Sequence, residues 1–538
     1  MKKRITSFIM AAAFLSGCGA SQNYSSSPAS TTAYSPSARY YEDSVDMYET
    51  TTYQDVPAGD CSDMPDENYP QDYTGHNTEE YKSIRENSYK STLTDPLSTF
   101  SADVDTASYT YVRRMLSYGQ TIPADAVRIE EMINYFDYSY PEPKEGEPFS
   151  VTTEIADCPW NKDTRLMRIG LKTEDIDLSE RQPMNLVFLI DVSGSMYDED
   201  KLPLVQKSFH ILTDQMTPSD RVSIVTYADG DRVVLDGADG NDRAKILDAI
   251  YSLSAGGSTW GSAGIKKAYE IAEDHFIEGG INRVILATDG DLNLGVTSES
   301  RLKELIEEKR ESGVFLSVFG FGQGNIKDNK METLADNGNG NYYYIDSERE
   351  AQKVLKEEMS GTLITVAKDV KLQVEFNPAY IKGYRQIGYE DRALAAEDFN
   401  DEKKDAGEIG AGHTVTALYE IVMKDSPMEL TSDLKYTDPS SLGEQNSELL
   451  TISVRYKAPD GDESRLLSYP VTEEAYTYGM SGDMRFAAAV AEFGLLLRDS
   501  EYKGTADKRS LQELLRECDT AGDEYKEEFG ELVRKSRI

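Results

Sequence analysis

The chain carries little positive charge for its length. Its 538 residues include 56 Lys and Arg against 96 Asp and Glu, which gives a formal net charge of −40. Phosphate contacts need a surplus of Lys and Arg, so this composition argues against a nucleic-acid-binding protein. It also argues against docking of the folded body on anionic lipid. An acidic surface of this kind fits a well-solvated protein that works with divalent cations.

Cysteine and histidine are also scarce, with four of each. Cys18, Cys61, Cys158 and Cys518 lie far apart and form no C-x-x-C pair, so their spacing indicates no zinc site. A disulfide among the last three is compatible with an oxidising compartment, but the sequence does not assign the pairing. The scattered histidines are expected to be structural or exposed rather than ligands; they are His76, His210, His275 and His413.

The chain lacks a nucleotide-binding loop and, beyond its first residues, a long apolar run. No G-x-x-x-x-G-K-[ST] pattern occurs, which argues against an ATPase or any other nucleotide-binding chain. After residue 18, no stretch is long and apolar enough to span a bilayer as a helix.

Residues 1–18 have the pattern of a bacterial export signal, with basic residues before a short apolar core. The sequence LSGC at its end resembles a lipobox, so we expect Cys18 to become the lipidated first residue. Ordinary secretory cleavage is the alternative. The resemblance implies a lipid-anchored protein of the cell envelope that faces the periplasm or the cell exterior.

Residues 19–93 are rich in Ser, Thr, Tyr, Asp and Glu and show little apolar periodicity. This composition predicts a disordered tether that lifts the folded part off the membrane. The many tyrosines leave a second interpretation open, a segment that orders on contact with a partner.

The most informative stretch is residues 185–197, with the sequence NLVFLIDVSGSMY. Its apolar run predicts a strand buried on both faces. Asp191, Ser193 and Ser195 follow, so one carboxylate and two hydroxyls leave the strand in a single turn. The carboxyl edge of an open parallel sheet is where ligands bind. Oxygen ligands suit a hard cation, Mg²⁺ first, with Mn²⁺ or Ca²⁺ as alternatives.

Two later motifs supply further oxygen atoms. Thr259 ends a Gly-rich GGST loop between two helical stretches, and Asp289 ends a second buried strand in VILATDG. The predicted metal ligands are therefore Asp191, Ser193, Ser195, Thr259 and Asp289. A set of turn and cap residues without a metal is the alternative.

The order and spacing of these motifs resemble the metal-ion-dependent adhesion site of von Willebrand factor type A domains. The resemblance implies a doubly wound, mostly parallel, Rossmann-like α/β sheet over residues 185–360. It also implies that a bound divalent cation captures an Asp or Glu side chain of a partner protein, without enzymatic activity. The expected partner-binding rim consists of Met196, Tyr197, Trp260, Asp291, Leu292 and Asn293.

Two other functions are also compatible with these residues. A hydrated metal beside an Asp could serve hydrolysis, with Asp291 as the one extra candidate base, but no histidine lies near the motif. Metal domains of this type also serve as adaptors of cytoplasmic ATPases. An exported chain would lie in a different compartment from such an ATPase.

The metal domain is flanked on its N-terminal side by residues 94–184. Two helical stretches come first, and Asp103 and Asp105 are interpreted as helix-cap carboxylates. Alternating patterns then predict strands at 149–155 and 166–171.

On the C-terminal side, residues 361–475 predict further alternating strands, with a long loop over 383–412, and residues 476–538 predict three helices. We predict that the strands of both flanks join in one β-sandwich, with the metal domain inserted and its metal edge pointing away. Independent domains in series are the alternative. The helices would form a small unit packed on the sandwich.

Both flanks resemble those of bacterial von Willebrand factor type A lipoproteins of the YfbK-like family. The family's role is poorly defined, so this resemblance implies architecture more than function.

Overall fold

The computed structural model describes residues 78–102, 105–176, 181–257, 262–290, 299–404, 406–430, 447–459, 461 and 463–538. Residues 1–77 lie outside the described part, including Cys18 and most of the predicted tether. None of the helices in the described ranges has the length and apolar character needed to cross a bilayer.

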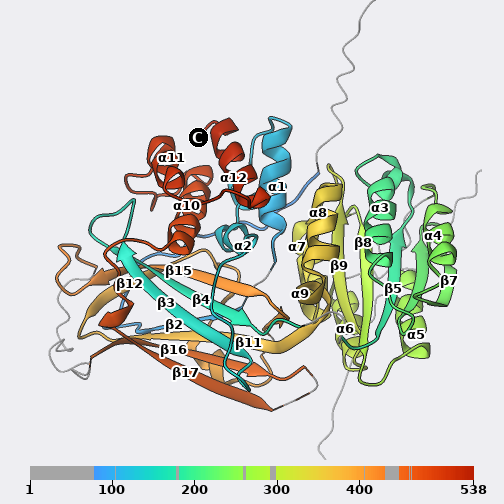
Figure 1. Cartoon of the computed structure of the whole chain (residues 1–538), viewed down its shortest axis with the longest axis horizontal. Helices are drawn as coiled ribbons and strands as arrows, with labels where there is room; N and C mark the ends of the chain where they lie inside the picture. Colours follow the sequence, from blue (N-terminus) through green and yellow to red (C-terminus); the bar gives the residue numbers. More distant parts are fainter. Residues whose placement is uncertain are drawn as a thin grey trace, which may run out of the picture. The chain divides into compact units, whose positions relative to one another are not determined.

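A six-stranded sheet in the order β10-β9-β8-β5-β6-β7 forms the centre of the predicted metal domain (Figure 1). Its pairs are parallel except that of β6 with β7, which is antiparallel. This confirms the doubly wound sheet. The strands are β5 (Met184–Asp191), β6 (Arg221–Tyr227), β7 (Asp231–Asp239), β8 (Ile281–Thr288), β9 (Phe315–Phe321) and β10 (Tyr342–Ile345).

Helices cover both faces of this sheet, as Figure 1 shows. Phe188 of β5 packs in the core shared with α3 and α4, whereas Leu189 packs in the core shared with α5, α6 and α7. The apolar residues at the centre of β5 follow one another without a break in the sequence, because the whole strand is buried. The helices are α3 (Leu202–Thr213), α4 (Arg243–Tyr251), α5 (Ser262–Asp274), α6 (Glu299–Arg310) and α7 (Asp328–Asn337).

The domain closes with α8 (Glu348–Gln352), a π-helical turn η3 (Lys353–Glu357) and α9 (Met359–Leu363). The chain then enters β11, the strand that follows the domain.

Two further sheets form a β-sandwich from both flanks of the domain. One sheet has the order β1-β12-β15-β4-β3 and the other β13-β2-β11-β16-β17. Ile421 of the first and Leu372 of the second share one buried core. The central sheet lies in the chain between β4 and β11, so the predicted metal domain is inserted in the sandwich. The strands are β1 (Lys90–Ser91), β2 (Leu97–Ser101), β3 (Phe149–Asp157), β4 (Arg165–Thr173), β11 (Thr365–Phe376), β12 (Ile381–Ile387), β13 (Ala393–Leu394), β14 (Gly407–Gly410), β15 (Thr414–Met423), β16 (Glu448–Lys457) and β17 (Ser464–Thr472).

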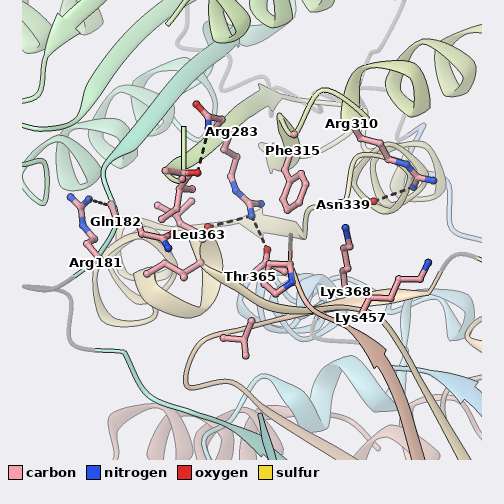
Figure 2. Close-up of a pocket in the computed structure, with 18 of the residues that line it drawn as sticks. Arg181, Gln182, Arg283, Arg310, Phe315, Asn339, Leu363, Thr365, Lys368 and Lys457 are labelled. Atoms are coloured by element: carbon pink, nitrogen blue, oxygen red, sulfur yellow. Dashed lines mark hydrogen bonds between the residues drawn. The ribbon is translucent and has the colours of Figure 1, made fainter. Parts of the chain in front are cut away.

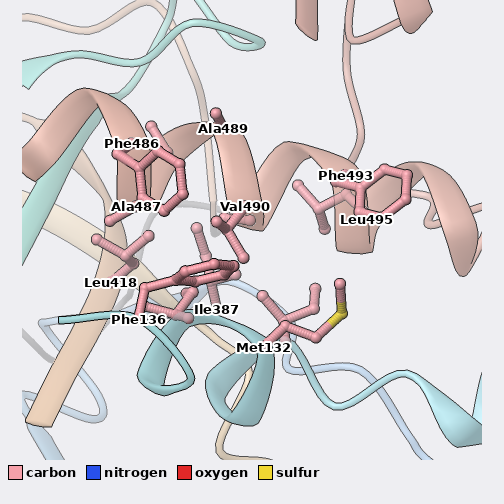
Figure 3. Packing of buried hydrophobic residues seen from close by; sticks show 14 of the residues in the cluster. Met132, Phe136, Ile387, Leu418, Phe486, Ala487, Ala489, Val490, Phe493 and Leu495 are labelled. Atoms are coloured by element: carbon pink, nitrogen blue, oxygen red, sulfur yellow. The ribbon is translucent and has the colours of Figure 1, made fainter. Parts of the chain in front are cut away.

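A helical unit packs on the first of these sheets (Figure 3). Phe136 lies in its core, 4.9 Å from the ring of Phe486, and Leu418 of β15 belongs to the same cluster. The unit includes N-terminal as well as C-terminal helices, which the sequence interpretation kept apart. They are α1 (Ala107–Ser117), α2 (Ile129–Asn134), α10 (Gly482–Leu497), α11 (Lys508–Arg516) and α12 (Glu524–Lys535).

The disordered tether predicted for residues 19–93 extends too far along the chain. Residues 78–93 pack against the folded part: Glu79 pairs with Arg114 at 2.8 Å, and Tyr81 stacks edge-on against Tyr111. The segment then adds β1 to the sandwich. Its apolar periodicity is weak because isolated tyrosines and ion pairs, rather than an amphipathic stripe, anchor it.

Two smaller expectations about the flanks are wrong. Asp105 does not cap α1; its carboxylate accepts a hydrogen bond from the backbone N–H of Tyr342 at 2.9 Å and pairs with Arg392 at 2.8 Å. Asp103 lies outside the described residues. The expected loop over 383–412 instead contains most of β12, together with β13 and β14.

Buried arginine–carboxylate pairs join the inserted domain to its flanks. Arg113 of α1 contacts Asp346 at 2.5 Å and Glu350 at 2.8 Å, and all three side chains are at most 7% exposed. Glu528 of α12 lies 3.4 Å from the same guanidinium. Arg113 therefore links the helical unit to the end of the inserted domain.

Replacing Arg113 by Ala should lower the free energy of unfolding by about 3–5 kcal/mol, because Asp346 and Glu350 would stay buried without their cation. Urea denaturation followed by circular dichroism would measure the change. Arg509→Ala is the matched control, since its pair with Glu513 is exposed and should contribute under about 1 kcal/mol. Equal effects of the two substitutions would contradict the prediction.

Candidate metal centre

Two predicted ligands lie at one edge of the central sheet. Asp191 is the last residue of β5, and Asp289 follows directly after β8. These strands are adjacent and parallel, with Ile190 paired to Ala287, so their carboxyl ends meet at the same edge. The sheet thus brings together two carboxylates that are about a hundred residues apart in the chain.

The carboxylate of Asp191 is fully buried. Its Oδ1 accepts a 2.8 Å hydrogen bond from the backbone N–H of Ser193, and Thr288 Oγ1 lies 3.5 Å from its Oδ2. Burial raises the pKa of Asp191 to about 6, against the lowering effect of the Ser193 hydrogen bonds. A cation beside the carboxylate would favour its ionised form again.

The two predicted hydroxyl ligands face each other. Ser193 Oγ and Ser195 Oγ lie 3.0 Å apart in the turn after β5. Hydrogen bonds tie this turn to the Gly-rich loop, from Gly194 N–H to the Gly257 carbonyl at 3.0 Å and from Gly256 N–H to the Val192 carbonyl at 2.8 Å. The loop carrying the predicted ligand Thr259 therefore starts beside the other ligands.

Gly257 adopts a positive φ of 84°, and an added Cβ would lie 2.5 Å from an oxygen of the Asp229 carboxylate. The positive φ and this close approach favour glycine at position 257 over residues with a side chain. Thr259 itself lies outside the described residues.

Lys201 is a member of the centre that the sequence interpretation missed. Its ammonium donates to Asp289 Oδ2 at 2.9 Å and to the Ser195 carbonyl at 3.0 Å, and it is 4% exposed. Asn325 Nδ2 lies 3.4 Å from the same carboxylate oxygen. Lys201 thus neutralises Asp289 and holds the turn of Ser195 against β8.

Gly322 makes room for this lysine. It adopts a φ of 72°, and a Cβ at that position would lie 2.4 Å from the Lys201 side chain. No pattern in the sequence links a lysine six residues after Ser195 to Asp289. The contact arises only because α3 packs against the edge of the sheet where β8 ends.

The predicted rim is only partly placed. Tyr197 is 80% exposed beside the centre, as a rim residue should be. Met196 is fully buried in the core with α3 and α4, so its assignment to the rim is wrong; its side chain anchors the turn from inside. Trp260, Asp291, Leu292 and Asn293 lie outside the described residues.

The donor set suits a hard divalent cation that prefers oxygen. In the described part of the chain, no three His, Cys, Asp or Glu side chains gather into a metal cage. The predicted set relies instead on two carboxylates and neutral hydroxyls, and one carboxylate already has an ammonium partner. Asp191, Ser193 and Ser195 are therefore the described residues best suited to hold the ion.

Three family models match the chain. The von Willebrand factor type A domain matches residues 185–357, the inserted domain. A model described as von Willebrand factor matches residues 75–168, and one described as the C-terminal part of uncharacterized protein YfbK matches residues 361–538. Together they cover most of the described flanks and nearly all of the central sheet.

Uncharacterized protein YfbK of Escherichia coli K12 is 43% identical over 469 residues, which cover 85% of this chain and 80% of that protein. The chain belongs to the YfbK family. Inter-alpha-trypsin inhibitor heavy chain H3 of Mesocricetus auratus is 26% identical over 264 residues, covering 45% of this chain and 29% of that protein.

Solved structures resemble parts of this YfbK-family chain. A von Willebrand factor type A protein from Catenulispora acidiphila superposes with a TM-score of 0.41 at 18% identity, covering 72% of this chain and 89% of that one. Domains of the type matched here generally mediate protein–protein interaction or adhesion and are not generally enzymes.

Replacing Lys201 by Met should destabilise this YfbK-family protein by about 3–5 kcal/mol in EDTA, because Asp289 would lose its buried cation. Urea denaturation would measure the loss. Lys207→Met, on the same helix, is the control; its pair with Glu348 is more than half exposed and should matter little. A Lys201→Met protein as stable as wild type would show that the buried pair contributes nothing.

Proposed function

We propose that this protein is a lipid-anchored, extracytoplasmic protein-binding module that captures an Asp or Glu of a partner protein through a divalent cation. The observation that carries the proposal is the meeting of Asp191, Ser193, Ser195 and Asp289 at one edge of the parallel sheet. The matched domain type supports a role in protein–protein interaction.

The charge balance of the centre favours capture of an incoming carboxylate. Lys201 pairs with Asp289, so Asp191 is left as the predicted anionic ligand without a lysine partner. The remaining described donors, Ser193 and Ser195, are neutral hydroxyls. A Mg²⁺ ion held by this set, or Mn²⁺ or Ca²⁺ in its place, would supply an electrophilic position for a carboxylate oxygen of the partner.

Residues around the edge would add specificity. Tyr197 presents an exposed aromatic ring two residues after Ser195, and exposed aromatic side chains are frequent anchors in interfaces. Trp260, Asp291 and Asn293 are proposed to complete this rim, on sequence grounds alone.

Isothermal titration calorimetry with Mg²⁺, Mn²⁺ and Ca²⁺ tests the metal centre directly. We expect saturable uptake by the wild-type chain and loss of uptake in Asp191→Ala. Asp198→Ala is the matched control, because Asp198 is exposed on the same turn and is not a predicted ligand. Crosslinking and pull-down from envelope extracts should lose the same partners in Asp191→Ala and in EDTA, but keep them in Asp198→Ala.

Absence of metal uptake by the wild-type chain would overturn the proposal. Turnover of a generic ester or phosphoester that disappears in Asp191→Ala would favour a metal-dependent hydrolase instead. Within the described residues, no histidine hydrogen-bonds to Asp191, Ser193, Ser195 or Asp289; His210 bonds Tyr251 and His275 bonds Asp236. An adaptor of a cytoplasmic ATPase would require the chain to stay in the cytoplasm.

The lipid anchor at Cys18 is proposed from the sequence of the export signal. Replacing Cys18 by Ser should abolish labelling of the protein by a radioactive fatty acid, since the acylated thiol would be missing. Metabolic labelling followed by immunoprecipitation measures this loss. Cys61→Ser is the control and should leave the labelling unchanged. A wild-type protein that takes up no label, or a Cys18→Ser protein that takes up as much as wild type, would refute the anchor.

A further inference from the structure

A cavity of about 920 Å³ lies at the end of the central sheet opposite the metal edge. Arg283 at the start of β8 and Phe315 at the start of β9 line it from the inserted domain, and Lys368 of β11 and Lys457 of β16 line it from the sandwich (Figure 2). Both chain connections between the domain and the sandwich pass this cavity, at Gln182 and at Leu363–Thr365.

Arg283 is a buried cation without a carboxylate partner. It is 1% exposed, and its guanidinium donates to neutral acceptors: Ser317 Oγ at 2.5 Å, and the Leu363 carbonyl and Thr365 Oγ1 at 3.3 Å. Among the described residues, nothing accepts a hydrogen bond from its Nε and no carboxylate pairs with it. Burial lowers the pKa of Arg283 to about 10, and the charges of Tyr343 and Glu408 offset this effect only in part.

Two lysines meet across the sandwich strands at the same cavity. Lys368 is paired directly with Lys457 in the register of β11 and β16, and like charges opposite each other destabilise a sheet. Lys457 pairs with Asp369 at 2.7 Å, whereas Lys368 forms no ion pair with a described carboxylate. The cavity therefore keeps a second uncompensated cation.

The backbone of β11 is irregular next to Lys368, and this irregularity affects the direction of the Lys368 side chain. The register of β11 shifts between Lys368 and Lys371, and Asp369 adopts a φ of 54°, which is rare for a residue with a side chain. Such bulges are frequent beside binding sites, because they re-aim a side chain. Figure 2 shows Lys368 and Lys457 on one side of the space and Arg283 and Phe315 on the other.

The described lining carries a surplus of positive charge, in contrast to the net charge of −40 of the whole chain. Arg181 also lines the cavity, but Asp220 compensates it at 2.6 Å. Among the described residues of the lining, the carboxylates are Glu311 and Asp369, and Lys457 engages Asp369.

We propose that this cavity binds a small anion with a carboxylate or phosphate group, which Lys368 contacts and the buried charge of Arg283 attracts. The ligand would neutralise cations from both the inserted domain and the sandwich. Both connections between the inserted domain and the sandwich pass the cavity. A bound anion would therefore stabilise the position of the domain on the sandwich, at the end of the sheet opposite Asp191. The proposal does not depend on metal binding at Asp191.

Calorimetric titration of the purified chain in EDTA with inorganic phosphate and with citrate tests this site. We expect saturable binding of phosphate or citrate. The anion that binds more tightly shows whether the cavity prefers a phosphate or a carboxylate group. Lys368→Glu should weaken binding at least about tenfold, since it replaces a charge-assisted hydrogen bond by repulsion. Lys245→Glu is the matched control: it changes the charge equally on exposed α4, outside the cavity lining.

Lys368→Gln serves as a second variant if the charge reversal prevents folding, and it should weaken binding in the same direction. Asp191→Ala should bind the anion like wild type, which separates this site from the metal centre. The proposal is overturned if neither anion binds the wild-type chain. It is equally overturned if the Lys368 variants bind like wild type, or if Lys245→Glu weakens binding as much as Lys368→Glu.

Discussion

Buried ion pairs between arginines and carboxylates hold the inserted domain in place on its flanks. Arg113 joins α1 to the segment after β10, and Arg128 pairs with Asp328 and Glu332 of α7. Charges removed from water at such sites are favourable only when their partners are present, so each pair requires the helical unit and the domain to dock in one arrangement. The orientation of the metal edge follows from that docking.

The two ends of the central sheet consequently have different surroundings. At the carboxyl end of β5 and β8 lie Asp191, Asp289 and the hydroxyls of Ser193 and Ser195, with Lys201 paired to Asp289. At the opposite end, Arg283 and the two lysines of the sandwich surround a cavity. Acidic and hydroxyl oxygens thus lie at one end, and at the other end lie Arg283 and Lys368, which form no ion pair with a described carboxylate. This contrast fits the proposed partner site at one end and the proposed anion site at the other.

Much of the architecture could be predicted from local patterns. The apolar run of β5 predicted a strand of a parallel sheet, and the alternating residues of β3, β4 and β15 predicted strands of a sandwich. Burial of β15 on both faces could not be predicted, because the second face is covered by the helical unit, whose helices are distant in the sequence. The segment 78–93 was misassigned because single tyrosines and an ion pair with Arg114 anchor it, and such contacts leave no periodic signal.

The sequence by itself determined which oxygen-bearing residues follow the strands, since Asp191, Ser193, Ser195 and Asp289 come directly after apolar runs. The tertiary structure alone decided that Met196 is buried, that Lys201 neutralises Asp289, and that Arg283 shares a cavity with Lys368. The reason is physical. Strand periodicity is a local property of neighbouring residues, whereas the pairing of charges depends on which distant segments exclude water from the same place.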